Sequence, residues 1–262
     1  MIDKNIKLVA LDMDGTLLDS QNRQPEDFVK WVEAHENIQT VIASGRQYYT
    51  LKEMFPAAFN KLIFAAENGA IVFKNDEMLF SSNISNADIR WCVDYFEKDA
   101  SAHVIICGAK AAYMKHNTKE IEDICGIYYR KIEFVDSLYD ILEKDSIVKL
   151  AIYYKNGKVR EAYDSLKALP KSLELVISGK NWMDISNRDV SKGHAIKELQ
   201  KSMGISREES MAFGDYLNDY TMLQSCEESY AMENAQPELK AIAKYITASN
   251  NEDGVMKVLR KL

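Results

Sequence analysis

Two acidic loops, one toward each end of the chain, carry the side chains that could do chemistry. Asp12 and Asp14 follow the apolar run 6–11, and Asp215 and Asp219 follow the shorter apolar run 211–213. Asp12 and Asp14 are two residues apart at the end of an extended segment, so their side chains start on the same side of the chain. Carboxylates about 4 Å apart repel by about 4 kcal/mol at an effective dielectric constant of about 20. A cluster of all four would need a bound cation or a shared proton.

The residue types in these loops indicate which cation would fit. They offer only oxygen ligands, without histidine or cysteine beside them, and such a set favours Mg²⁺, which keeps water ligands and binds phosphate. The alternative is that aspartate-rich turns merely end strands, which is the commoner role of any single turn of this kind. Against that alternative, the first loop is followed in order by Ser44-Gly45, by Lys192 at a predicted helix start, and by the sequence GDYLND at 214–219.

Short apolar strands alternate with helices at both ends of the chain. The runs 6–11, 41–43 and 211–213 read as buried strands, and amphipathic helices follow them. Ser191 is a plausible N-cap for a helix that Gly204 closes. This alternation predicts an α/β fold with a Rossmann-like parallel-sheet core. Ligands bind at the carboxyl ends of such strands, where the loops after 11, 43 and 213 should meet.

The middle of the chain has a different pattern of expected secondary structure. Its expected strands are longer and more strictly alternating, over 103–107, 112–115, 128–134, 147–154, 173–178 and 182–185, and helices are expected over 86–98 and 158–168. This pattern predicts a second, α+β domain inserted into the first. We therefore expect residues 1–82 and 187–262 to form a discontinuous core, and residues 83–186 to form the insertion.

Composition excludes several classes of partner. The 262 residues are 47% hydrophobic and 28% charged, and 33 Lys and Arg against 40 Asp and Glu give a net charge of −7. That charge disfavours nucleic acid and anionic membranes as partners. No segment approaches the roughly 18 apolar residues of a membrane span, and no secretory signal is recognisable, so we expect a cytoplasmic protein. The four cysteines are widely spaced, which argues against a zinc site or disulfide framework.

The ordered motifs resemble those of the haloacid dehalogenase superfamily, and within it the Cof-like, type IIB phosphatases that carry a large α/β cap. Asp12-Met13-Asp14-Gly15-Thr16-Leu17 resembles the first motif, Ser44-Gly45-Arg46 the second, Lys192-Gly193 the third, and Gly214-Asp215 through Asn218-Asp219 the fourth. Further matches at 67–70 and 249–255 extend the resemblance over the whole chain. One departure is Glu233, where relatives have glycine; we expect altered turn geometry or substrate preference there.

The resemblance implies a role for each motif residue. Asp12 is the nucleophile that forms an aspartyl-phosphate, and Asp14 is the general acid and base. Mg²⁺ is held by the Asp12 carboxylate, the Asp14 backbone carbonyl and the Asp215 carboxylate. Phosphate is bound by the backbone N–H of Met13, by Ser44, by the Gly45 N–H, by Lys192 and by Asn218. Asp219 and Thr16 orient these groups without binding phosphate or metal themselves.

The expected activity is Mg²⁺-dependent hydrolysis of small phosphate esters, with sugar phosphates first, and pyridoxal phosphate or flavin mononucleotide behind them. The inserted domain would act as a cap that favours small molecules over phosphoproteins. A phosphomutase using the same aspartates is a second reading. A non-catalytic metabolite sensor or interaction module is a third, which the presence of Asp12, Asp14, Lys192 and Asp215 disfavours. The sequence leaves open the particular metabolite and the oligomeric state.

Overall fold

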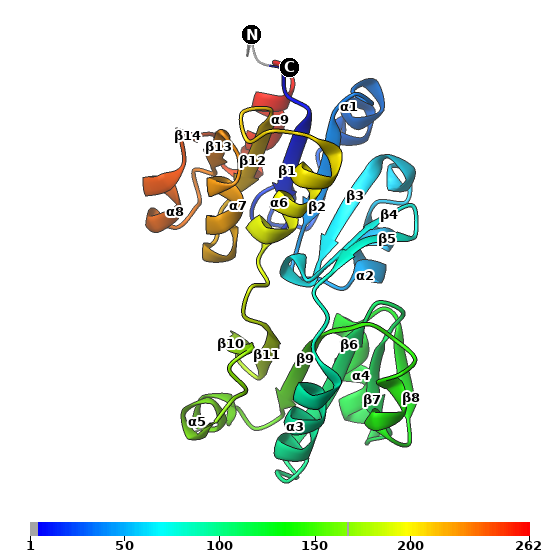
Figure 1. Cartoon of the computed structure of the whole chain (residues 1–262). Helices are drawn as coiled ribbons and strands as arrows, with labels where there is room; N and C mark the ends of the chain where they lie inside the picture. Colours follow the sequence, from blue (N-terminus) through cyan, green and yellow to red (C-terminus); the bar gives the residue numbers. More distant parts are fainter. Residues whose placement is uncertain (1–4, 167) are drawn as a thin grey trace. The chain divides into compact units, whose positions relative to one another are not determined.

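The computed structural model describes residues 5–166 and 168–262 and divides into two compact units (Figure 1). One unit joins the residues up to Phe80 to Ser191–Leu262, and the other is Ser81–Val190. The predicted boundaries, after residue 82 and before residue 187, fall a few residues from these divisions. The α/β fold class with a parallel-sheet core is confirmed.

The first unit is built on an eight-stranded sheet within the described residues. In chain order its strands are β1 (Leu8–Asp12), β2 (Gln39–Ala43), β3 (Leu62–Ala66), β4 (Ile71–Lys74), β5 (Glu77–Ser81), β12 (Ser210–Gly214), β13 (Glu228–Ala231) and β14 (Tyr245–Ile246). They lie in the order β14-β13-β12-β1-β2-β3-β4-β5. Pairing is parallel from β14 to β3 and antiparallel between β3 and β4.

Strand β1 lies in the middle of this sheet because its sequence, LVALD, suits a strand covered on both faces. All five of its residues are buried, as expected for a parallel strand with helices above and below it. Ala10 pairs with Val41 of β2 on one side and with Ala212 of β12 on the other. The carboxyl ends of β1, β2 and β12 therefore lie side by side, and each leads into one of the predicted site loops.

Helices cover both faces of the parallel sheet (Figure 1). They are α1 (Phe28–Ala34), α2 (Tyr48–Met54), α6 (Lys192–Met203), α7 (Tyr220–Gln224), α8 (Pro237–Ile242) and α9 (Gly254–Leu259), with short 3₁₀ turns η1 (Phe59–Lys61), η2 (Glu67–Gly69), η4 (Leu217–Asp219) and η5 (Asn250–Glu252). The boundaries predicted for α6 are confirmed. Ser191 Oγ accepts a hydrogen bond from the His194 N–H at 3.1 Å, and Gly204 ends the helix with a φ of 65°.

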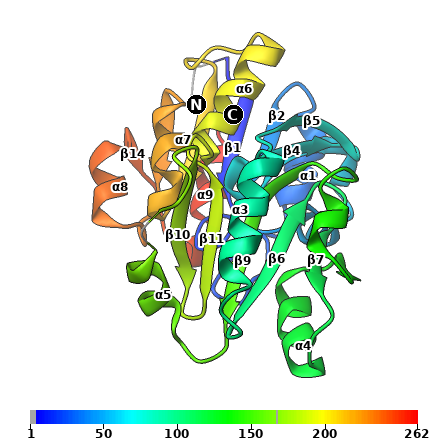
Figure 2. The same cartoon turned by 60° about the horizontal axis from the view of Figure 1, so that its bottom comes forward.

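The second unit holds a six-stranded sheet within the described residues, in the order β10-β11-β9-β6-β7-β8. Its strands are β6 (Ala102–Gly108), β7 (Ala112–Lys115), β8 (Ile132–Val135), β9 (Ile147–Tyr154), β10 (Leu173–Gly179) and β11 (Trp182–Asn187); its helices are α3 (Asn86–Phe96), α4 (Lys119–Tyr128) and α5 (Val159–Ser165), with the 3₁₀ turn η3 (Leu138–Ile141). Figure 2 shows α3 lying over one face of this sheet, and side chains of both pack in one apolar cluster. Separate apolar clusters form with α3 and with α4, around Ile89 and Cys125 respectively.

One sequence expectation in this unit is wrong. The strand predicted over 128–134 begins only at Ile132, since Tyr128 is the last residue of α4 and residues 129–131 connect that helix to the strand. Ile121 and Cys125, four residues apart, are the buried positions of α4, which is the spacing of one helix face. The run of Ile and Tyr at its end favours a strand locally, so packing outweighs local preference there.

The described part of the chain contains no helix with the length and apolar character required to cross a bilayer. All four cysteines are free and buried, so none forms a disulfide. Burial raises the pKa of Cys92, Cys125 and Cys226 to about 12 in each case. These thiols therefore serve as apolar packing groups.

Candidate active site

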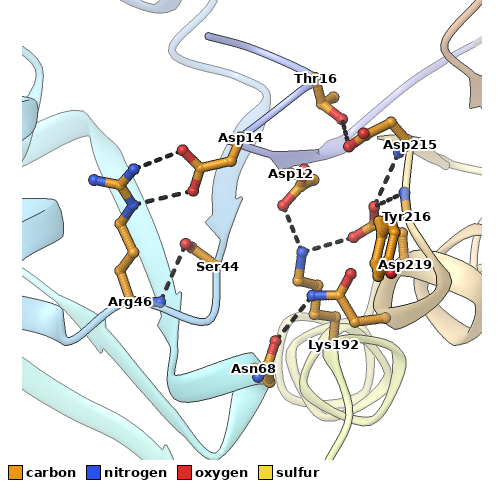
Figure 3. Close-up of polar contacts among 11 residues, drawn as sticks. Asp12, Asp14, Thr16, Ser44, Arg46, Asn68, Lys192, Asp215, Tyr216 and Asp219 are labelled. Atoms are coloured by element: carbon orange, nitrogen blue, oxygen red, sulfur yellow. Dashed lines mark hydrogen bonds and ion pairs between the residues drawn. The ribbon is translucent and has the colours of Figure 1, made fainter. Parts of the chain in front are cut away.

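The acidic loops of the first unit meet at the carboxyl edge of its parallel sheet (Figure 3). Asp12 is the last residue of β1 and is 7% exposed. Oxygens of Asp12, Asp215 and Asp219 all lie within 4.8 Å of one another. The structure thus brings together three of the four predicted carboxylates.

Lys192 is the basic residue at the centre of this cluster. It is the first residue of α6 and is fully buried. Its Nζ donates to Asp12 Oδ1 at 2.5 Å and to Asp219 Oδ1 at 2.6 Å. Burial alone would lower the pKa of Lys192, but the two carboxylates reverse that effect and raise it above its usual value. The ammonium therefore stays charged and fixed beside Asp12.

Three carboxyl groups, those of Asp12, Asp215 and Asp219, surround the Lys192 ammonium. Burial raises the pKa of Asp12 and of Asp215, and it raises that of Asp219 to about 6. Three carboxylates face one ammonium, which is the situation in which an additional cation is favourable. Thr16 Oγ1 donates to Asp215 Oδ1 at 3.0 Å and fixes that carboxylate. The donor atoms are all oxygens, so the residues present fit Mg²⁺.

Protein donors occupy both oxygens of the Asp219 carboxylate. Oδ1 accepts from Lys192, while Oδ2 accepts from the backbone N–H of Asp215 at 3.0 Å and of Tyr216 at 3.1 Å. A carboxylate held in this way fixes its neighbours. It orients Lys192 and shapes the loop that presents Asp215.

The Asp14 carboxylate lies apart from this cluster and is held by Arg46. Arg46 Nε and Nη2 donate to its two oxygens at 3.0 and 2.6 Å, a bidentate arrangement. Figure 3 shows Asp14 directed toward Arg46 and away from Lys192. The Asp14 side chain is 50% exposed. The sequence places Arg46 in the second motif without indicating its partner, and the structure identifies that partner as Asp14.

The predicted phosphate loop follows β2. Ser44 is buried, and its Oγ accepts a hydrogen bond from the Arg46 N–H at 3.2 Å. A Cβ built on Gly45 would lie 3.3 Å from both Nδ2 and Oδ1 of Asn68, so any larger residue would press on that amide. Asn218 Nδ2 in turn donates to Asn68 Oδ1 at 3.0 Å. Asn68 is a site residue to which sequence reasoning gave no role, although it lies in the matched stretch 67–70.

The first loop is held by its own backbone and by the C-terminal region. The Met13 side chain is buried, and its backbone N–H contacts the Asp12 carboxylate. Asn234 Nδ2 donates to the Gly15 carbonyl at 2.8 Å, and Asn234 Oδ1 accepts from the Asn250 N–H at 3.1 Å. Asn234 follows the unusual Glu233, so this turn still supports the first motif despite the missing glycine.

Comparison with known protein families identifies the class of protein in which this buried Asp–Lys–Asp cluster occurs. The model of the haloacid dehalogenase-like hydrolases matches residues 9–259. The chain belongs to the haloacid dehalogenase-like hydrolase family. The predicted resemblance is confirmed, and so is the prediction that the chain is an enzyme of this type.

Individual relatives are similar over nearly their whole length. The 5-amino-6-(5-phospho-D-ribitylamino)uracil phosphatase of Escherichia coli (strain K12) is 33% identical, and the match covers 98% of this chain and 96% of the relative. A crystal structure from Streptococcus mutans UA159 is 30% identical, with a TM-score of 0.80 and 98% of each chain covered. A Thermotoga maritima structure has a TM-score of 0.87 at 23% identity, covering 98% of this chain and 97% of that one. This last likeness is one of fold.

Proposed function

We propose that the protein is a Mg²⁺-dependent phosphatase that hydrolyses small phosphate esters through a phosphorylated Asp12. The observation that carries this proposal is the buried contact of Lys192 with Asp12 and Asp219 beside Asp215. Spontaneous hydrolysis of phosphate monoesters is so slow that enzymes accelerate it by up to ~10²¹-fold. A nucleophile, a proton donor and several positive groups must therefore act together.

Asp12 attacks phosphorus with one carboxylate oxygen, and the bond from phosphorus to the leaving oxygen breaks. Lys192, fixed against Asp12, offsets the negative charge on the transferring group without having to reorganise. Ser44 and the backbone N–H groups of Met13 and Gly45 donate to the phosphoryl oxygens, and Asn218 adds a side-chain donor. This arrangement divides one difficult displacement into two easier ones.

Asp14 supplies the proton transfers. It lies two residues after the nucleophile, and Arg46 limits it to a defined orientation at the rim of the site. We infer that it protonates the leaving oxygen in the first step and takes a proton from the attacking water in the second. Asp12 is thereby restored as a free carboxylate, and inorganic phosphate leaves.

The metal site uses the Asp12 carboxylate, the Asp14 backbone carbonyl and the Asp215 carboxylate. When bound, Mg²⁺ neutralises charge between the nucleophile and the incoming phosphate. Thr16 fixes Asp215 in place, and Asp219 keeps Lys192 and the 215–216 backbone aligned. Both supporting residues act without contacting the substrate.

The substrates we propose are sugar phosphates and related polyol phosphates, with Ser81–Val190 acting as the cap that selects among them. The E. coli relative bears the name of a phosphatase for a ribityl phosphate, which is a phosphorylated polyol chain. That similarity supports a small hydroxyl-rich leaving group. The four buried, free thiols are compatible with the reducing cytoplasm, where we place the enzyme.

The experiment that tests this proposal is a screen for phosphate release over sugar, polyol and nucleotide phosphates, compared by kcat/KM. Activity should require Mg²⁺, disappear with EDTA and return when Mg²⁺ is added in excess. The Asp215→Asn variant should need far more Mg²⁺ for half-maximal activity, because one anionic ligand is lost. Turnover that is indifferent to EDTA would contradict the metal site, and a need for a bisphosphate activator would indicate a mutase.

A further inference from the structure

The connection between β3 and β4 has an unusual backbone. Glu67, Asn68 and Gly69 have φ values of 51°, 57° and 88° in succession. Residues with a Cβ seldom adopt this left-handed region, although asparagine does so more readily than most. Such conformations persist where the surrounding structure enforces them, and they are concentrated at functional sites. This turn lies at the carboxyl end of β3, which is the active edge of the sheet.

The turn is bonded to the phosphate loop through the backbone. The Asn68 N–H donates to the Ser44 carbonyl at 2.9 Å, and the Glu67 N–H donates to the Arg46 carbonyl at 3.1 Å. The Ser44 N–H donates to the Ala65 carbonyl at 2.9 Å. The Asn68 backbone therefore has a fixed position relative to Ser44, and the Asn68 side-chain amide lies against Gly45.

The same amide reaches the fourth motif. Asn218 Nδ2 donates to Asn68 Oδ1 at 3.0 Å, a contact drawn in Figure 3, although the two residues are 150 positions apart. Asn218 lies in η4 and is exposed, so its side chain would otherwise sample several rotamers. A hydrogen bond to a rigid partner selects one of them before the substrate arrives.

We propose that Asn68 is a positioning residue that fixes the Asn218 amide beside the phosphate loop, so that Asn218 meets the substrate's phosphoryl group in a single orientation. This inference rests on the proposed phosphatase function, in which Asn218 contacts phosphate. Asparagine meets both requirements of position 68, because it tolerates the left-handed backbone and supplies the acceptor. Glycine would meet only the first.

The test compares Asn68→Gly, Asn218→Ala and the double variant. Asn68→Gly keeps the backbone conformation and removes the acceptor. Asn75→Gly is the matched control, because Asn75 has a φ of 52° in the turn between β4 and β5. The measurements are the Kd of inorganic phosphate by calorimetry in the presence of Mg²⁺, and kcat and KM for p-nitrophenyl phosphate.

Asn218→Ala should weaken phosphate binding about 10-fold, as expected for one hydrogen bond to a charged group. Asn68→Gly should weaken it by up to the same factor, because the Asn218 amide is then no longer held in one orientation. KM should rise with the phosphate Kd, and kcat should change less. The double variant should bind phosphate no more weakly than Asn218→Ala does, because Asn68 acts only through the Asn218 side chain. Asn75→Gly should bind phosphate as the wild type does.

Unchanged phosphate affinity in Asn68→Gly would overturn the proposal, and so would losses that multiply in the double variant. Thermal unfolding of each variant shows whether a loss of phosphate affinity is caused by destabilisation of the fold. Calorimetry also separates this inference from the proposed function. A wild type that binds phosphate but hydrolyses no ester would refute the phosphatase, while a non-multiplying loss of phosphate affinity would still support the role of Asn68.

Discussion

At the residue scale, the site is a set of charged groups with assigned partners. Lys192 is shared between Asp12 and Asp219, and Thr16 holds Asp215. Because Asp12, Lys192 and Asp219 are buried together, loss of one of these side chains leaves another buried charge uncompensated. Such losses are costly even where the intact pair adds little net stability. The intact cluster therefore contributes mainly geometry and reactivity, although removal of one member would destabilise the protein.

Replacing Arg46 with Gln should release Asp14 from its fixed orientation. We expect kcat to fall by about 10-fold, with a smaller change in KM, because proton transfer depends on the placement of the acid. Arg46→Lys should recover only part of the loss, since an ammonium cannot reproduce the bidentate contact. Steady-state kinetics on a substrate with a poor leaving group makes the measurement, and an unchanged kcat in Arg46→Gln would rule out this role.

The sequence could identify the motif residues but not all of their partners. Asp12, Ser44, Lys192 and Asp215 follow or begin predicted elements, so parallel-sheet topology alone predicts that their loops meet. The pairing of Asp14 with Arg46 depends on side-chain orientation within a loop. That of Asn68 with Asn218 depends on a left-handed turn that no local pattern in the sequence indicates.

At the element scale, the ends of short helices and strands position the charged side chains of the site. Helix α6 begins at Lys192, and Ser191 Oγ caps it by accepting from the His194 N–H. These boundaries were predictable because caps are local signals in the sequence. Helix α4 was not predicted, although Ile121 and Cys125 have the spacing of one helix face, and the expected strand overlapped only its last residue, Tyr128.

The Ser191→Ala variant should loosen the helix end that carries Lys192. We expect a loss of about 1 kcal/mol of stability from the missing cap, together with a several-fold loss in kcat. Ser85→Ala is a matched control, because Ser85 Oγ caps α3 by accepting from the Asp88 N–H at 3.1 Å. The control should lose similar stability in its own unit and retain its kcat. Denaturant titration and kinetics on both variants make the comparison, and equal losses of kcat would contradict the link to Lys192.

At the scale of the whole molecule, residues from distant parts of one chain build the site. Asn250 Nδ2 donates to the Leu18 carbonyl at 2.8 Å, which ties the C-terminal region to the first loop. The second unit has its own apolar clusters. Its two ends are joined where Asn187 Nδ2 donates to Ser82 Oγ at 3.0 Å and to the Asn83 carbonyl at 2.9 Å. A domain whose two ends lie close together can be inserted into the chain of another domain without preventing that domain from folding.

Residues 81–190 should therefore fold when expressed alone. We expect cooperative thermal unfolding and dispersed amide signals by NMR, because the unit carries its own core and its ends are close together. The isolated unit should release no phosphate from any ester, since Asp12, Lys192 and Asp215 lie outside it. An unfolded fragment would contradict its autonomy, and a fragment with phosphatase activity would contradict the location of the chemistry.

The central claim is that Asp12 itself becomes phosphorylated, and trapping the intermediate tests it most directly. The Asp14→Asn variant should accept phosphate from an activated aryl ester but release it slowly, because the base for the second step is missing. Acid quenching followed by peptide mass spectrometry should find one phosphoryl group, on Asp12. The same experiment with Asp12→Asn added should find none. Phosphate on another residue, or none in Asp14→Asn despite turnover by the wild type, would contradict the account.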